Sequence, residues 1–171
     1  MAPCRIMVVG PSGGGKSTAA VRIGTALDLP VHHLDRLTFA PGWIEKPEAD
    51  WIDELEAIVA TDAWVIDGND SSTMNRRLAR ADAIVFIDTP PLRRLVNVLR
   101  RNLAYRGTTR PDMAPGNPER LNLEFLSYVA RWDHGPRRKV EAKLAGHEDR
   151  IVRLKTPHAL DDWIAAATRA A

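Results

Sequence analysis

The sequence predicts an α/β fold in which five parallel strands form a sheet that is flanked by helices. Three observations support this prediction: short β-rich runs alternate with helical segments, a glycine-rich motif directly follows the first run, and aspartates follow several of the others. Strands that alternate with helices form βαβ units, and such units build parallel sheets. The chain has 171 residues, of which 44% are hydrophobic and 27% charged, so we expect one globular domain over residues 1–171.

The expected elements follow from hydrophobic periodicity and from breaker residues. The interval 38–48 contains Pro41, Gly42 and Pro47 and is expected to be a loop, as is the Gly/Pro/Thr/Arg-rich interval 105–118. Apolar residues at 92, 95, 96, 99 and 103 predict a helix whose apolar stripe faces the core, with Arg94 directed away from it. Strands are expected at 5–10, 31–34, 63–67, 83–88 and 151–154, and helices at 16–27, 49–60, 72–80, 92–103, 119–144 with a break near 134–136, and 160–167.

The motif after the first strand fits the pattern G-x-x-x-x-G-K-[ST], which defines a phosphate-binding P-loop. Glycines let backbone N–H groups approach phosphate oxygens, and the following helix directs its N-terminus at the same anion. Lys16 is expected to reach the β- and γ-phosphates, and Ser17 to ligate Mg²⁺. The motif therefore predicts a P-loop NTPase fold that binds ATP with Mg²⁺ through Gly10, Pro11, Ser12, Gly13, Gly14, Gly15, Lys16, Ser17 and Thr18.

Three aspartates at strand ends are candidates for the acidic groups of the site, because ligands of open parallel sheets bind outside the carboxyl ends of the strands. Asp67 is the preferred metal-site carboxylate and Asp88 the weaker candidate. Asp35 could act as a general base toward an attacking hydroxyl group. Each could instead be an ordinary turn or helix-capping residue.

Six arginines lie within eighteen residues that contain no acid: Arg93, Arg94, Arg100, Arg101, Arg106 and Arg110. Arg106 and Arg110 fall in the expected loop, where arginine suits the clamping of a phosphoryl group. A mobile loop with such residues is typical of a closing lid, which we expect at about 105–118. Nucleic-acid binding is the competing use of the same charge.

Several motifs in order make the chain resemble the small P-loop proteins known as DNA topology modulation proteins, which are relatives of adenylate kinase. They are GPSGGGKST at 10–18, HHLD at 32–35, PGW at 41–43, WVIDGN at 64–69, RLARADAIVFID at 77–88, YRGTTRPD at 105–112 and NPERLNLEFL at 117–126. The chain departs from the family pattern at Asp70, where tyrosine is favoured, and at Asn117, where cysteine is favoured.

The resemblance implies an adenylate-kinase-like fold with an arginine-rich lid. It also implies that Asp67, before Gly68, organises the magnesium, that the backbone near Pro157 holds the adenine, and that the lid arginines are Arg101, Arg106 and Arg110.

The sequence as a whole predicts ATP- and Mg²⁺-dependent phosphoryl transfer to a small-molecule acceptor, with nucleosides and nucleotides among the candidates. Asp35, Asn69 and Arg76 are expected to face the acceptor, and Lys16 with the lid arginines to act on the phosphoryl group. The alternative is a nucleotide-binding regulator that contacts DNA through its arginine-rich segment. A lone cysteine and the lack of a long apolar run favour a cytoplasmic protein.

Overall fold

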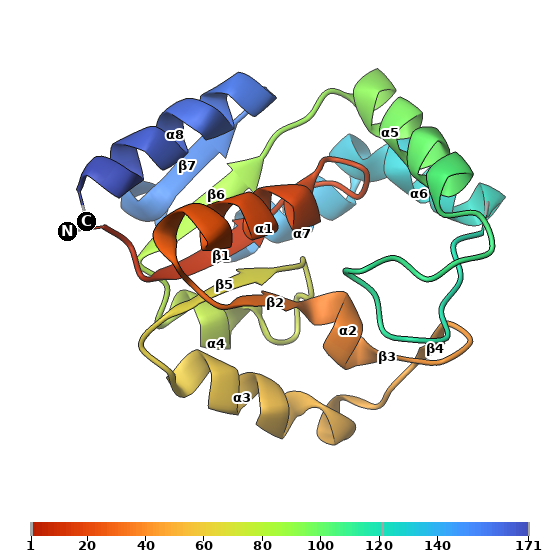
Figure 1. Cartoon of the computed structure of the whole chain (residues 1–171), viewed down its shortest axis with the longest axis horizontal. Helices are drawn as coiled ribbons and strands as arrows, with labels where there is room; N and C mark the ends of the chain where they lie inside the picture. The colour runs from red at the N-terminus through yellow and green to blue at the C-terminus, as the bar shows by residue number, and fades with distance from the viewer. Residues whose placement is uncertain (1, 121, 171) are drawn as a thin grey trace.

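The computed structural model describes residues 2–120 and 122–170 and contains the predicted five-stranded parallel sheet. The strand order is β2-β5-β1-β6-β7, and every neighbouring pair is parallel. The strand that precedes the P-loop therefore lies at the centre of the sheet (Figure 1). The bounds of the strands are β1 Arg5–Val9, β2 Val31–His33, β5 Trp64–Asp67, β6 Ala83–Ile87 and β7 Ile151–Leu154.

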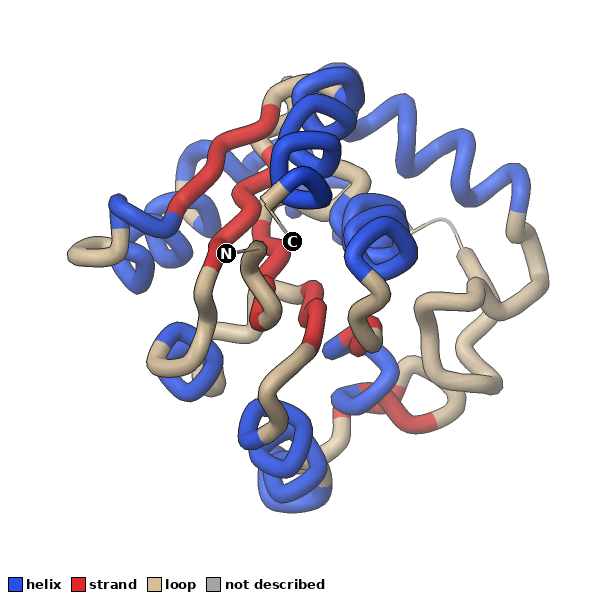
Figure 2. Tube along the Cα trace, turned by 60° about the vertical axis from the view of Figure 1, so that its left-hand side comes forward, coloured by secondary structure: helices blue, strands red, loops and turns tan. Residues whose placement is uncertain are grey.

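Helices cover both faces of the sheet, and Figure 2 shows the strands enclosed between them. Helices α1 and α8 pack on one face, while α3, α4 and α7 pack on the other. The helices are α1 Lys16–Leu27, α2 Leu34–Thr38, α3 Ile52–Ala60, α4 Met74–Leu78, α5 Pro91–Ala104, α6 Leu123–Arg131, α7 Pro136–Leu144 and α8 Pro157–Arg169, with short 3-10 turns at Glu48–Asp50, Trp132–His134 and Glu148–Arg150.

Successive side chains of a strand point to opposite faces of the sheet. Because helices cover both faces, the central strand β1 is buried on both sides. Ile6 and Val8 join the core beneath α1 and α8, whereas Met7 and Val9 join the core beneath α3 and α7. All four side chains are fully buried. This packing fixes the carboxyl end of β1, and the P-loop begins directly after it.

The structure corrects the expected loop at 38–48, which contains a small antiparallel hairpin of β3 (Phe39–Ala40) and β4 (Ile44–Glu45). The hairpin is held by the interval 105–118: Trp43 N donates to Asn117 Oδ1 (2.5 Å), and Trp43 Nε1 donates to the carbonyl of Pro118 (2.9 Å). These partners are more than seventy residues away along the chain, so local breaker residues could not reveal them.

The prediction for α5 was wrong in its orientation. Leu92 and Leu103 of the apolar stripe are 75% and 74% exposed, while Arg94 is 1% exposed. Arg94 forms a two-pronged ion pair with Asp133, at 2.7 Å and 3.2 Å, and Val98 packs beside it against the P-loop. A distant carboxylate thus allows Arg94 to be buried together with Val98 and Asn102, while Arg93 and Arg100 stay exposed.

Other boundaries differ as well. The strand expected at 31–34 ends at His33, and α2 begins at once. The helical segment expected over 119–144 begins only at Leu123, and its expected break near 134–136 is present as a 3-10 turn between α6 and α7. In the part of the chain that the structure describes, no helix has both the length and the apolar character needed to cross a bilayer.

Candidate active site

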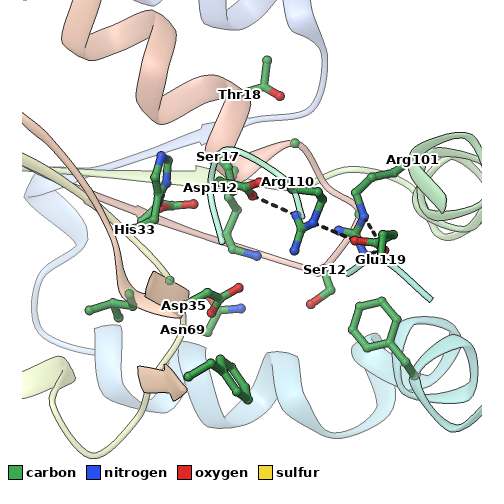
Figure 3. Close-up of a pocket in the computed structure, with 18 of the residues that line it drawn as sticks. Ser12, Ser17, Thr18, His33, Asp35, Asn69, Arg101, Arg110, Asp112 and Glu119 are labelled. Atoms are coloured by element: carbon green, nitrogen blue, oxygen red, sulfur yellow. Dashed lines mark hydrogen bonds and ion pairs between the residues drawn. The ribbon is translucent and has the colours of Figure 1, made fainter. Parts of the chain in front are cut away.

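A cavity of about 1230 Å³ lies at the carboxyl ends of the strands, where the P-loop, the end of β2, the end of β5, α5 and the interval 105–118 meet. Figure 3 shows the side chains that line it. Open parallel sheets bind ligands at this edge. Among the predicted residues, the lining includes Ser12, Gly13, Gly15, Lys16, Ser17, Thr18, Asp35, Asp67, Asn69, Arg101 and Arg110.

The P-loop has the backbone that its glycines allow. Gly13 has φ +74°, and a Cβ atom there would lie 2.5 Å from the carbonyl oxygen of Arg94. Gly10 has φ +138°, and its Cβ would lie 2.3 Å from the carbonyl oxygen of Ile87. Only glycine fits both positions, because the backbone conformation and the space each exclude a side chain. The first N–H groups of α1, from Lys16 onward, have no partner within the helix, so the loop forms an anion cradle.

Three side chains hold the P-loop in place. Asn69 accepts from Gly10 N (3.0 Å) and donates to Gly10 O (2.6 Å), so its amide closes a two-bond ring with the backbone. Thr89 donates to the carbonyl of Gly14, and Asn97 of α5 donates to that of Gly13, both at 2.9 Å. Sequence analysis assigned Asn69 to the acceptor and missed the other two. A polar residue two positions after the end of β6 was the available signal for Thr89.

Asp67 is the strand-end carboxylate that the sheet brings into the cavity. The register pairs Asp67 with Val8 on β1 and with His33 on β2. Its side chain is almost fully buried and lies 2.5 Å from His33 Nδ1. Burial disfavours a charge on His33, but the hydrogen bond and the negative charge of Asp67 outweigh it and raise the pKa of this imidazole. Sequence analysis gave His33 no role.

Asp88, the weaker candidate, does not line the cavity. Both of its carboxylate oxygens accept from Arg137 of α7, at 2.8 Å and 3.3 Å.

Asp35 lies in the first turn of α2, on the cavity wall. Its side chain is exposed to the cavity. Desolvation by the neighbouring protein raises the pKa of its carboxyl group; Lys16 opposes the shift and Asp67 adds to it. Lys16 donates to the carbonyl of Pro11 (3.2 Å), and burial lowers the pKa of its ammonium group despite the nearby carboxylates of Asp67 and Asp35. The lysine and the candidate base therefore share one electrostatic environment.

Two arginines of the expected lid converge on one buried carboxylate, Glu119 (Figure 3). Arg101 approaches Glu119 Oε1 at 2.9 Å, and Arg110 Nε approaches Oε2 at 2.7 Å. The second contact is a close charge pair without the alignment of a hydrogen bond. Arg110 also donates to Asp112 (2.8 Å). Both guanidinium groups thus line the cavity with carboxylate partners already beside them.

Besides Asp88, six predicted residues do not line the cavity: Gly10, Pro11 and Gly14 of the P-loop, and Arg76, Arg106 and Pro157. Arg76 turns outward and pairs with Glu56 (2.8 Å) and Glu48 (3.6 Å). Arg106 is exposed, and Pro157 is the first residue of α8.

Solved structures of other proteins share the fold of this chain. No family model matches the chain, and no curated protein matches it. Among solved structures, a gluconokinase from Sinorhizobium meliloti 1021 aligns with a TM-score of 0.54 and 19% identity, over 98% of this chain and 90% of its own. A shikimate kinase from Bacteroides thetaiotaomicron aligns with a TM-score of 0.55 and 17% identity, over 99% and 98%. A shikimate kinase from Aquifex aeolicus aligns with a TM-score of 0.53 and 17% identity, over 97% of both.

The chain therefore has the fold of the P-loop kinases, with a five-stranded parallel sheet flanked by helices. The narrower resemblance to DNA topology modulation proteins stays a prediction. The hydroxyl of Ser17 and the carboxylate of Asp67 line the same cavity as the anion cradle. Oxygen donors of this kind, completed by water and phosphate, fit Mg²⁺.

Proposed function

We propose that this chain is an ATP- and Mg²⁺-dependent kinase that transfers a phosphoryl group to a hydroxyl of a small molecule. One observation carries the proposal: Lys16, Ser17, Asp35 and Asp67 come from three separate segments of the chain and line a single cavity. Arg101 and Arg110 reach the same cavity from α5 and the lid. The shared fold with a gluconokinase and shikimate kinases supports this class of reaction.

At the donor end of the cavity, ATP binds to backbone N–H groups and to a positively charged side chain. The N–H groups of the P-loop cradle the phosphates, and the ammonium group of Lys16 contacts the β- and γ-phosphoryl oxygens. Ser17 and Asp67 would hold Mg²⁺, which when bound neutralises charge on the triphosphate. His33 fixes the carboxylate of Asp67 by its short hydrogen bond. We expect these contacts to direct the γ-phosphorus toward Asp35, which lines the same cavity.

Asp35 accepts the proton of the acceptor hydroxyl. The hydroxyl oxygen forms the new bond to the γ-phosphorus as the bond from that phosphorus to the bridging oxygen of ADP breaks, and the proton passes to the carboxylate. The raised pKa of Asp35 favours this step because a more basic carboxylate holds the proton better. Arg101 and Arg110 stabilise the phosphoryl oxygens in transit.

The lid excludes water from the transfer. The interval 105–118 rests on the hairpin 39–45 through Gly42 N, which donates to Gly116 O (2.9 Å), in addition to the two bonds from Trp43. Water that entered would take the phosphoryl group in place of the acceptor.

The first test measures ADP formation from Mg·ATP, with and without a panel of small hydroxyl compounds, together with mass analysis of the product. We expect one class of acceptor to stimulate ADP formation and to gain a phosphoryl group. Lys16→Ala should lower this rate by about 10²-fold or more, because it removes a charge-stabilising donor. Lys139→Ala, at an exposed site on α7, serves as the control. Stimulation of Lys16→Ala to the wild-type rate would disprove the proposal.

The regulatory alternative receives less support from the structure. Arg94, Arg101 and Arg110 of the arginine-rich segment are each engaged by a carboxylate. Phosphate contacts with DNA need exposed cations, and only Arg93, Arg100 and Arg106 of the six arginines are exposed. Binding of DNA that weakens steeply with salt, together with ATP consumption that no acceptor stimulates, would favour the alternative.

A further inference from the structure

The cavity has two flanks, and the sheet order defines them. The P-loop follows the central strand β1; α5 and α8 follow β6 and β7 on one side, while α2 and the interval 68–71 follow β2 and β5 on the other. Asp35 belongs to the second flank, together with the hairpin 39–45. A hydroxyl that delivers its proton to Asp35 must therefore bind at this flank, which we call the acceptor flank.

The acceptor flank is lined by carboxylates. Besides Asp35 it contains Asp70 and Glu45. Asp112 at the lid also lines the cavity, and its negative charge adds to the rise in the pKa of Asp35. An acceptor in this space faces the carboxylates of Asp35, of Glu45 in the hairpin and of Asp70 after β5, whereas Asp112 is paired with Arg110.

The cations at the acceptor flank are already engaged. Within residues 2–120 and 122–170, the cationic side chains that line this flank are Lys16, His33 and Arg110. Lys16 serves the donor phosphates, His33 is hydrogen-bonded to Asp67, and Arg110 pairs with Asp112 and Glu119. The other cations of the cavity, Arg22, Arg100, Arg101 and Arg120, come from α1, α5 and the segment before α6.

The arginines that follow β5 do not reach the acceptor. Arg76 pairs outside the cavity with Glu56 and Glu48. Arg77 is fully buried and donates to the carbonyls of Gly68 (3.0 Å) and Asp70 (2.8 Å), so it supports the backbone of the cavity wall. Neither guanidinium can clamp a carboxylate or a phosphate of the acceptor in this arrangement.

Two aromatic pairs complete the wall. Phe39 and Trp43 of the hairpin meet edge to face with their centroids 5.8 Å apart, and Phe125 and Tyr128 of α6 stack at 6.3 Å. All four line the cavity, and the negative charge of Asp35 acts on the hydroxyl of Tyr128. Aromatic faces attract apolar ring surfaces and cations, and they repel anions.

We infer that the phosphoryl acceptor carries no negative charge and is an uncharged or cationic hydroxyl compound with a ring, such as a sugar, cyclitol, amino sugar or nucleoside. This inference rests on the proposed kinase function. An acceptor with a carboxylate or phosphate at the acceptor flank would place an anion beside Asp35, Asp70 and Glu45, while the cations that line this flank already have partners. Such like-charge contacts select against a ligand.

The test compares matched acceptors that differ in charge. Each pair contains an uncharged or cationic compound and its anionic counterpart: a nucleoside and its 5′-monophosphate, a cyclic sugar and its uronate, an amino sugar and its N-linked carboxylate. The measured quantity is kcat/KM for phosphorylated product at saturating Mg·ATP. We expect the uncharged or cationic member of the accepted pair to be preferred at least tenfold.

A charge reversal sharpens the comparison. Glu45→Lys places a cation at the acceptor flank and should reduce the preference in the accepted pair several-fold. Asp53→Lys makes the same change of charge at an exposed site on α3 and should leave the preference unchanged. Equal or better use of the anionic member by the wild-type protein would overturn this inference and leave the kinase function standing. Absence of phosphorylated product from every pair, with ATP still bound, would overturn the kinase function and this inference with it.

Discussion

Replacement of Glu119 by glutamine tests whether ATP takes over the arginines of the lid. Glu119 is 5% exposed and lies 2.9 Å from Arg101 and 2.7 Å from Arg110. Glutamine keeps the shape and one acceptor oxygen but removes the charge. Removal of one partner of a buried ion pair costs about 3–5 kcal/mol. Arg101 remains 24% exposed and Arg110 keeps Asp112, so we expect Glu119→Gln to lower the free energy of unfolding by about 2 kcal/mol.

The loss should disappear when the triphosphate is bound, because phosphoryl oxygens then supply the missing charge to both arginines. Because the substitution destabilises only the ligand-free protein, the same free energy is recovered on binding, and the variant should bind the triphosphate more tightly. About 2 kcal/mol corresponds to roughly thirtyfold in the dissociation constant of a non-hydrolysable ATP analogue.

Two measurements check this: denaturant unfolding with and without the Mg²⁺-bound analogue, and calorimetric titration of the analogue. Asp82→Asn is the matched control, because Asp82 pairs with Arg5 at 2.7 Å outside the cavity. Its loss of stability should be the same with and without the analogue. If Glu119→Gln behaves like this control and binds the analogue no more tightly than the wild type, Glu119 does not compete with the triphosphate for the lid arginines.

Three further predictions concern the P-loop, the metal site and the buried ion pair of α5. Gly13→Ala should lower the unfolding free energy by about 2–4 kcal/mol, from left-handed backbone strain and overlap with α5, and should abolish ATP binding; unimpaired binding in a titration would contradict it. Asp67→Asn should raise the Mg²⁺ concentration needed for half-maximal activity, while Asp88→Asn should not, and equal shifts would argue against the assignment. The hydrogen bonds from Arg94 lower the pKa of Asp133, so the pair stabilises the fold above the ordinary carboxyl pKa, and this contribution is lost as the pH falls through the lowered value. Asp133→Asn should therefore be less stable than wild type at pH 7, with a gap that closes in acid; a gap that does not vary with pH would refute this.

The sheet and the P-loop could be predicted because their signals are local. The buried strands are short apolar runs, such as Ile6–Val9, and the P-loop needs glycine wherever the backbone has a positive φ or meets a carbonyl closely. Asp67 could also be predicted, since the carboxyl ends of parallel strands share one edge of the sheet. These features depend on neighbours in sequence or on the common direction of the strands.

Features that depend on distant charges could not be predicted. The periodicity of α5 was correct, yet its orientation was decided by Asp133, thirty-nine residues after Arg94. Glu119 pairs with both Arg101 and Arg110, although the local composition of the intervening segment indicates only a loop.

The sequence alone predicted the five strands of the sheet, the P-loop and most of the residues to which we assign the proposed phosphoryl transfer. Which arginines have carboxylate partners depends on the folded chain, because these pairs join remote segments. In the folded chain Arg76 lies outside the cavity, Arg110 pairs with Glu119, and Asp35 lies near other carboxylates at the acceptor flank. The chemistry of the site thus follows from local motifs, while its selectivity follows from long-range charge pairing that no single stretch of sequence contains.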